Sequence, residues 1–184
     1  MANKRETYLV ELAGLHRELP LFEVGPGVRI AVLNILGDTE LVQACARALA
    51  EKLAQANYDI LITAEAKSIP LIHSIAVETG KPYVVLRKVY KPYMGVALSA
   101  ETLSITTGNP QMLYLDEKDR EKIDGKQVML VDDVISTGST LQGMQLVVEK
   151  GGGKVAGYVA ICTEGERAKW ADVIALEHLP IFTD

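Results

Sequence analysis

Short apolar runs alternate with stretches of helical periodicity along most of the chain. Residues 28–33 and 59–63 are rich in branched side chains and are predicted strands. Between them, Asp38 is suited to cap a helix, because its side chain can accept a hydrogen bond from a backbone N–H of the first turn. The apolar positions that follow fall on one helical face: Leu41, Val42, Cys45, Leu49 and Leu53.

The same alternation continues towards the C-terminus. A second helix is expected to begin near Ser68, with Pro70 in its first turn and Gly80 just past its end. Further strands are predicted at residues 82–87, 127–131, 154–161 and 173–176. A third helix is predicted at residues 138–150, and the three glycines at 151–153 are expected to end it. Strands that alternate with helices predict an α/β fold, with a mostly parallel central sheet flanked by helices.

Two regions depart from this pattern. Residues 89–115 are polar or alternating and contain several glycines and prolines, which predicts a long connection of the kind that is usually functional. The first 27 residues precede the strand–helix core and end in the turn Gly25-Pro26-Gly27.

Length and composition fit one domain with a substantial core. The chain has 184 residues, of which 48% are hydrophobic, and a formal net charge of −5. An acidic chain lacks the positive field that nucleic-acid binding uses, and no apolar run is long enough to cross a bilayer. The N-terminus does not resemble a signal peptide, so a cytoplasmic protein without nucleic-acid or membrane partners is expected. Cys45 and Cys162 could form a disulfide, but nothing in their spacing argues for one or for a metal site.

The candidate chemistry lies in Val-Met-Leu-Val-Asp-Asp-Val-Ile-Ser-Thr-Gly-Ser-Thr, residues 128–140. Asp132 and Asp133 follow a buried strand, and ligands of open α/β sheets bind beyond such strand ends. A small, hydroxyl-rich turn then leads into a helix, whose first N–H groups suit a phosphate. The layout fits a ribose 5-phosphate, with its hydroxyls on the acids. The alternative is an ordinary capped turn with two solvated acids. A Walker A loop is excluded, since GxxxxGK[ST] has no match.

This stretch resembles the motif by which type I phosphoribosyltransferases bind 5-phosphoribosyl 1-pyrophosphate (PRPP). Thr-Ala-Glu-Ala-Lys-Ser-Ile-Pro at 63–70 and Val-Leu-Arg-Lys at 85–88 are similar to segments of adenine and archaeal-type hypoxanthine/guanine phosphoribosyltransferases. The resemblance implies a single domain over residues 1–184, an N-terminal hood (1–27) and a mobile loop (89–111).

The resemblance also implies roles for individual residues. The predicted catalytic residues are Asp132, Asp133 and Glu101, the last being the only carboxylate of the loop. Glu101 is equally compatible with an ordinary solvated position. The predicted 5′-phosphate site is formed by Val134, Ile135, Ser136, Thr137, Gly138, Ser139 and Thr140. The predicted pyrophosphate site is formed by Ala66, Lys67, Ser68, Arg87 and Lys88. Lys67-Ser68 replaces the Arg-Gly of many adenine enzymes, and a Cβ at Ser68 would constrain an unusual backbone there.

The expected activity is that of a purine phosphoribosyltransferase of purine salvage. PRPP and a purine base would give a nucleoside 5′-monophosphate and pyrophosphate, with Mg²⁺ as cofactor and a homodimer as the expected assembly. Adenine is slightly favoured by the overall resemblance, while hypoxanthine, guanine and xanthine stay open. The alternative is a non-catalytic regulatory protein of the same fold that senses PRPP or a nucleotide.

Overall fold

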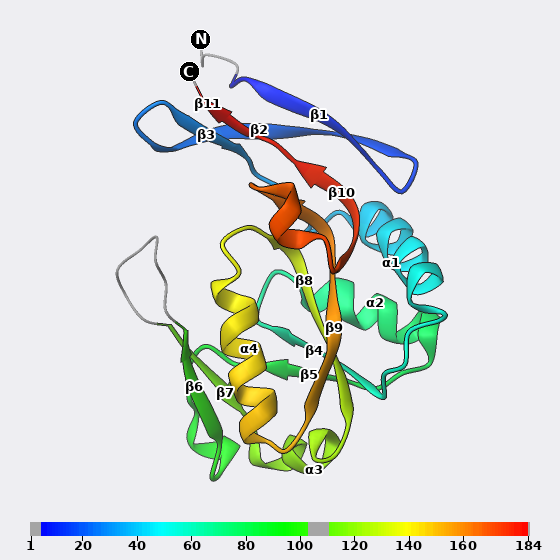
Figure 1. Ribbon diagram of the computed structural model, residues 1–184, viewed down its shortest axis with the longest axis vertical. Helices are drawn as coiled ribbons and strands as arrows, with labels where there is room; N and C mark the ends of the chain where they lie inside the picture. The colour runs from blue at the N-terminus through cyan, green and yellow to red at the C-terminus, as the bar shows by residue number, and fades with distance from the viewer. Residues whose placement is uncertain (1–4, 103–110, 184) are drawn as a thin grey trace.

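A five-stranded sheet forms the centre of the computed structural model, which describes residues 5–102 and 111–183 (Figure 1). Its strand order is β10-β9-β8-β4-β5, and every neighbouring pair is parallel. The strands are β4 (Ile60–Ala64), β5 (Tyr83–Leu86), β8 (Gln127–Ile135), β9 (Lys154–Glu164) and β10 (Val173–Leu179). The predicted α/β class with a mostly parallel sheet is confirmed.

Helices cover both faces of this sheet. Helices α1 (Thr39–Leu53) and α2 (Ile69–Thr79) lie on one face, and α4 (Ser139–Lys150) lies on the other (Figure 1). Leu49 and Leu71 pack into the same core as Val131 of β8, whereas Met144 packs with Leu130, the neighbouring position of that strand. Successive strand residues point to opposite faces, so β8 contributes to both cores. The remaining helical turns are η1 (Pro92–Met94), η2 (Glu117–Asp119), α3 (Arg120–Ile123) and η3 (Arg167–Trp170).

The predicted helix boundaries are confirmed by their caps. Asp38 Oδ1 accepts a hydrogen bond from the Leu41 N–H at 3.1 Å, at the start of α1. Helix α2 begins directly after Ser68 and ends at Gly80, which has a φ of 67°. A positive φ is readily adopted by glycine, which explains the sharp stop.

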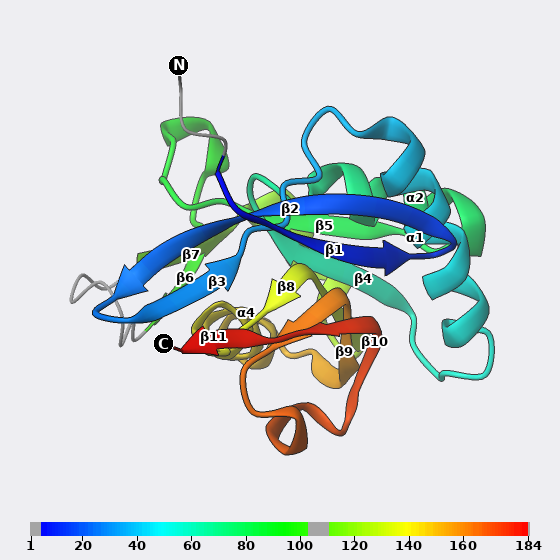
Figure 2. The same cartoon turned by 90° about the horizontal axis from the view of Figure 1, so that it is seen from above.

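A second, antiparallel sheet lies over the carboxyl ends of the central strands (Figures 1 and 2). This sheet, the hood, has the order β1-β2-β3-β11 and consists of β1 (Thr7–Leu12), β2 (Leu15–Gly25), β3 (Val28–Ala31) and β11 (Ile181–Thr183). The strand predicted at 28–33 therefore belongs to the hood and not to the parallel sheet. Its composition predicts a strand, but its two partners are β2, which precedes it in the chain, and β11 at the opposite end of the chain.

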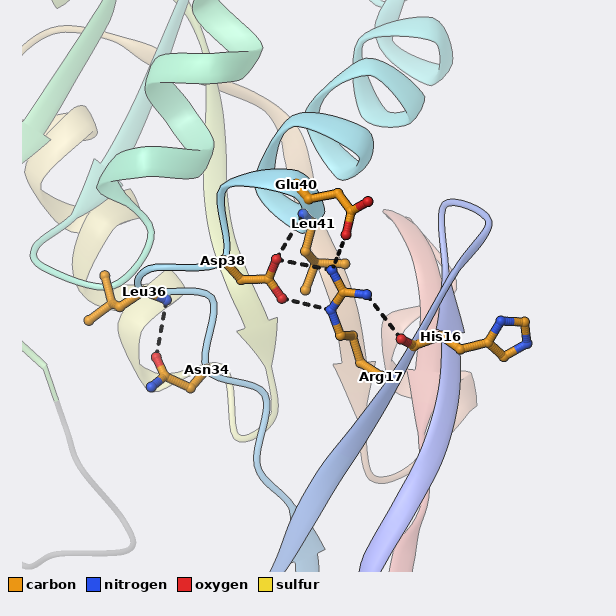
Figure 3. A network of polar contacts seen from close by, with 7 residues as sticks. All are labelled: His16, Arg17, Asn34, Leu36, Asp38, Glu40 and Leu41. Carbon is orange, nitrogen blue, oxygen red and sulfur yellow. Dashed lines mark hydrogen bonds and ion pairs between the residues drawn. The ribbon is translucent and has the colours of Figure 1, made fainter.

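An arginine of the hood joins it to the first helix of the core (Figure 3). Arg17 of β2 lies 2.7 Å from Asp38 Oδ2 and 2.9 Å from Glu40 Oε2. The hydrogen bonds from Arg17 hold the pKa of Asp38 below its usual range. In the connection between β3 and α1, Asn34 Oδ1 accepts from the Leu36 N–H at 3.2 Å. These contacts fix the hood relative to the N-terminus of α1.

The region predicted as one long connection, 89–115, contains a β-hairpin. Strands β6 (Leu98–Thr102) and β7 (Gln111–Leu115) pair antiparallel and pack against α4. The alternating residues there are therefore strand residues. Residues 103–110 of the predicted mobile loop lie outside the described residues, and the loop's mobility stays a prediction. Within the described part of the chain, no helix has the length and apolar character that a membrane span needs.

Candidate active site

Strand β8 extends further than its composition suggested and carries both acids. The predicted strand ended at residue 131, but pairing with β9 continues through Asp132, opposite Ala160, to Ile135, opposite Thr163. Asp133 is 5% exposed and Asp132 is half-buried. The alternative interpretation, in which both acids are solvated turn residues, is therefore excluded, because the acids belong to a regular strand.

The turn between β4 and α2 contacts both carboxylates. Ser68 Oγ lies 2.9 Å from Asp132 Oδ1 and 3.0 Å from Asp133 Oδ1, and it accepts from the Asp133 N–H at 3.0 Å. Its single proton can be donated to one carboxylate at a time. Lys67 Nζ lies 2.7 Å from Asp133 Oδ2 and donates to the Leu33 carbonyl at 3.0 Å. Two residues of the predicted pyrophosphate site thus meet the predicted ribose-binding acids.

The proximity of the two acids changes the ionisation of one of them. Burial, followed by the charge of Asp133, raises the pKa of Asp132 from 3.8 to about 7. The hydrogen bond from Ser68 opposes this rise in pKa, because it stabilises the carboxylate form. Near neutral pH, Asp132 therefore exchanges readily between its acid and its carboxylate form.

The cationic residues predicted for pyrophosphate lie at the ends of neighbouring strands. Arg87 follows β5 and donates through Nε to Glu65, which follows β4. The other Glu65 oxygen accepts from the Lys88 N–H at 2.6 Å. The Glu65–Ala66 peptide bond is cis, and Ala66 is exposed at the tip of the turn. The structure therefore brings the predicted pyrophosphate residues to one edge of the sheet.

The predicted phosphate turn connects β8 to α4. Gly138 precedes the first helical residue, Ser139, with a φ of 82°. An ideal Cβ at Gly138 would lie 2.8 Å from Cη2 of Trp170, so the turn is closely packed on one side. Lys169 Nζ donates to the Thr137 carbonyl at 3.2 Å on that same side. Ser136 and Thr137 are exposed, whereas Val134 and Ile135 belong to the strand and not to the turn.

A cavity of about 730 Å³ is lined by the predicted phosphate turn, Asp132 and the hood, whereas the predicted pyrophosphate residues and Asp133 do not line it. Its volume lies in the range of small-molecule sites, roughly 300–1,000 Å³. It is lined by Val24, Val28, Ile30 and Ile181 of the hood, by Asp132 and residues 134–141, and by Glu164 and Gly165. Of these lining residues, Asp132 and Glu164 carry charge.

Glu164 was not predicted as a site residue. The strand was predicted to stop at residue 161, but β9 continues to Glu164, which is 7% exposed. Burial raises the pKa of its carboxyl. The only sequence feature that could have identified Glu164 is its position just beyond an apolar strand. The same feature identified Asp132 and Asp133.

The structure does not bring Glu101 to the other candidate residues. It lies in β6 between Ala100 and Thr102, which are buried, and its own side chain is exposed. It does not line the cavity beside Asp132. Its catalytic role stays a prediction. Across residues 5–102 and 111–183, no group of three or more His, Cys, Asp or Glu side chains is arranged to hold a metal ion.

Comparisons with known proteins identify the family of the chain. The family model described as "Phosphoribosyl transferase domain" matches residues 32–177. A hypoxanthine/guanine phosphoribosyltransferase of Methanotorris igneus is 35% identical over 61% of this chain and 58% of its own length. A purine biosynthesis transcriptional repressor of Bacillus subtilis is 26% identical over 77% of this chain and 48% of its own length. The chain thus spans about half the length of these curated relatives.

A solved structure gives the same architecture. The adenine phosphoribosyltransferase of Thermoanaerobacter pseudethanolicus superposes with a TM-score of 0.69 at 22% identity, covering 87% of this chain and 95% of that one. At this identity, the similarity establishes the fold.

Proposed function

The chain belongs to the phosphoribosyl transferase domain family, and from this membership we propose that it is a purine phosphoribosyltransferase. It would transfer the 5-phosphoribosyl group from PRPP to a purine base, giving a nucleoside 5′-monophosphate and pyrophosphate. The observation that carries the proposal is one cavity that is lined together by Asp132, the turn at 136–140 and apolar residues of the hood.

The turn at 136–140 supports binding of the 5′-phosphate. The N–H groups at the start of a twelve-residue helix, α4, have no partners within the helix and attract anions. The hydroxyls of Ser136, Thr137 and Ser139 add further donors. Trp170 and Lys169 support the turn from its other side, so its shape is set before a ligand binds.

The two acids are proposed to have different roles. Asp132 is half-buried and lines the cavity, so it would accept hydrogen bonds from the ribose hydroxyls and stabilise positive charge developing on the sugar. Asp133 is buried and contacts Ser68 and Lys67, so it would position the turn at 65–68 beside the ribose. The bond from the anomeric carbon to pyrophosphate breaks, and a ring nitrogen of the base forms the new bond to that carbon. The base gives up its ring N–H proton to solvent, and pyrophosphate leaves with the electron pair of the broken bond.

The leaving pyrophosphate would lie against the turn at 65–68, with Arg87 and Lys88 nearby. Cations held in place before the reaction stabilise negative charge as it develops on the leaving group. Mg²⁺ fits this arrangement, since it takes oxygen ligands from one or two carboxylates and from substrate phosphates while keeping several waters. Asp132 is the carboxylate that could contribute, and the bound ion would neutralise charge on the pyrophosphate.

The test is release of pyrophosphate from PRPP with adenine, hypoxanthine, guanine and xanthine. Asp132→Asn is expected to lower kcat by about 10²–10³, the usual effect of losing one electrostatic partner of the transition state. Asp133→Asn is expected to lower both activity and melting temperature, because Lys67 loses its ion pair. Asp172→Asn, at an exposed position, is the matched control.

Two outcomes would decide against the proposal. Near-wild-type activity of Asp132→Asn would show that Asp132 does not bind the ribose. Tight binding of PRPP or a nucleotide without turnover with any base would instead indicate a regulatory sensor.

A further inference from the structure

Glu164 places a buried negative charge on the wall of the cavity. Its side chain is 7% exposed and lines the same space as Asp132. Within the described residues, its carboxylate makes no hydrogen bond or ion pair. A largely buried carboxylate with no protein partner keeps only part of its hydration, here on the side that faces the cavity. A ligand that donates hydrogen bonds would replace the water that the carboxylate has lost.

The backbone around Glu164 is held in place by its neighbours. The His178 ring of β10 bonds to Thr163 Oγ1 at 2.8 Å and to the Gly165 carbonyl at 3.0 Å, one residue to either side. Trp170 Nε1 donates to the carbonyl of Glu164 itself at 2.9 Å. The backbone that carries the largely buried Glu164 side chain is therefore held in place on both sides.

The kinds of groups that line the cavity indicate which part of a ligand Glu164 would meet. The turn at 136–140 takes the phosphate and Asp132 takes the ribose under the proposed function. The rest of the lining is Glu164, Gly165 and apolar residues, namely Val134, Ile135 and Leu141 beside the turn and Val24, Val28, Ile30 and Ile181 of the hood. Apolar side chains suit the faces of a planar base, which leaves Glu164 to contact an edge of it.

We propose that Glu164 determines base specificity by accepting hydrogen bonds from the N–H groups of a 6-oxopurine, guanine above all. This inference rests on the proposed function and deepens it. An ionised carboxylate only accepts hydrogen bonds. Guanine presents two adjacent donors, N1–H and the 2-amino group, and hypoxanthine presents N1–H. Adenine places an acceptor nitrogen beside its amino group, which would face a carboxylate oxygen unfavourably. The site therefore selects against the adenine that the overall resemblance slightly favoured.

The test exchanges the carboxylate for an amide. Glu164→Gln keeps the shape but offers one donor and one acceptor, the pattern that matches the amino group and ring nitrogen of adenine. We expect kcat/KM for guanine to fall by about 10- to 100-fold, the value of a hydrogen bond to a charged group. The value for adenine should be unchanged or rise. Glu166→Gln, an exposed carboxylate two residues along, is the matched control and should leave both values unchanged.

Binding of GMP, IMP and AMP, measured by calorimetry, gives a second readout that is independent of turnover. Wild-type protein should bind GMP and IMP more tightly than AMP, and Glu164→Gln should reduce this difference. If Glu164→Gln melts at the wild-type temperature and its affinities for GMP and IMP relative to AMP are unchanged, the inference is overturned.

The wild-type protein alone also tests the inference, should Glu164→Gln fail to fold. Preference for adenine over guanine and hypoxanthine would overturn the role of Glu164 but leave the phosphoribosyltransferase assignment intact. Absence of turnover with every base, together with absence of nucleotide binding, would overturn the proposed function itself.

Discussion

Asp132→Asn should make the protein more stable at alkaline pH while it impairs the proposed activity. In the wild type, burial and then Asp133 disfavour the charged form of Asp132 and raise its pKa to about 7. An asparagine has no charge to desolvate. Its carbonyl can still accept the two hydrogen bonds that Asp132 Oδ1 receives, from Ser68 Oγ at 2.9 Å and from the Asp133 N–H at 2.9 Å. The substitution therefore removes the repulsion and keeps the local hydrogen bonds.

The size and sign of the effect follow from proton linkage. The pKa of Asp132 is about 7 in the folded protein and near 3.8 when unfolded, so between these values the folded state holds a proton that the unfolded state has lost. The contribution of Asp132 to the stability of the wild type therefore falls as pH rises from about 4 to about 7, and it is fully lost above pH 7. At about 1.4 kcal/mol per pKa unit, the shift corresponds to roughly 4 kcal/mol, and partial exposure of Asp132 reduces this to about 2–4 kcal/mol.

Thermal melting at a series of pH values measures this effect. For a chain of this size, about 2–4 kcal/mol corresponds to roughly 5–15 °C in Tm. Asp132→Asn should exceed the wild type by this amount at pH 8, and the difference should disappear towards pH 4. Asp172→Asn, which removes an exposed carboxylate, should show no such pH-dependent gain. A difference between Asp132→Asn and wild type that is the same at pH 5 and pH 8 would refute the reasoning.

Two further predictions follow from the same contacts. The Ser68 hydrogen bond lowers the pKa of Asp132, so Ser68→Ala should raise that pKa and move the acidic limb of the kcat/KM profile to higher pH. An unmoved limb would show that Ser68 does not act on Asp132. Cys45 and Cys162 are free and buried, and burial raises the pKa of Cys45 to about 12 and also raises the pKa of Cys162. Both should react with thiol reagents only after unfolding, and rapid labelling of the native protein would contradict this.

Elements with local signals could be predicted from the sequence. The Asp38 cap, the apolar face that follows it, and Gly80 after α2 each depend on residues within a few positions of one another. The motif at 128–140 could also be recognised, since a buried strand, two acids and a turn of small residues follow one another directly in the sequence. These features are set by backbone propensity and capping, which act over short distances.

Features that depend on distant partners could not be predicted. The strand at 28–33 looks like a core strand, but β3 pairs with β11, some 150 residues away. The alternating residues in 89–115 belong to a hairpin whose inner face packs on α4. Strand β8 continues past its apolar run because residues up to Ile135 pair with β9, and β9 continues to Glu164 because it also pairs with β10. The pattern of apolar residues in the sequence identifies a strand, but pairing with other strands determines which sheet it joins and how long it is.

The replacement of Arg-Gly by Lys67-Ser68 illustrates how side chain and backbone must be considered together. The sequence raised the concern that a Cβ at position 68 would constrain the turn. Ser68 has a φ of −85° and a ψ of −1°, an ordinary right-handed conformation in which a Cβ is not strained. Its hydroxyl instead fills the space between two carboxylates, and Lys67 neutralises the buried one. Glycine could not make these contacts, so in this chain the proposed pyrophosphate turn is tied directly to the acids proposed to bind ribose. The ionisation of Asp132 is thereby linked to the position of that turn.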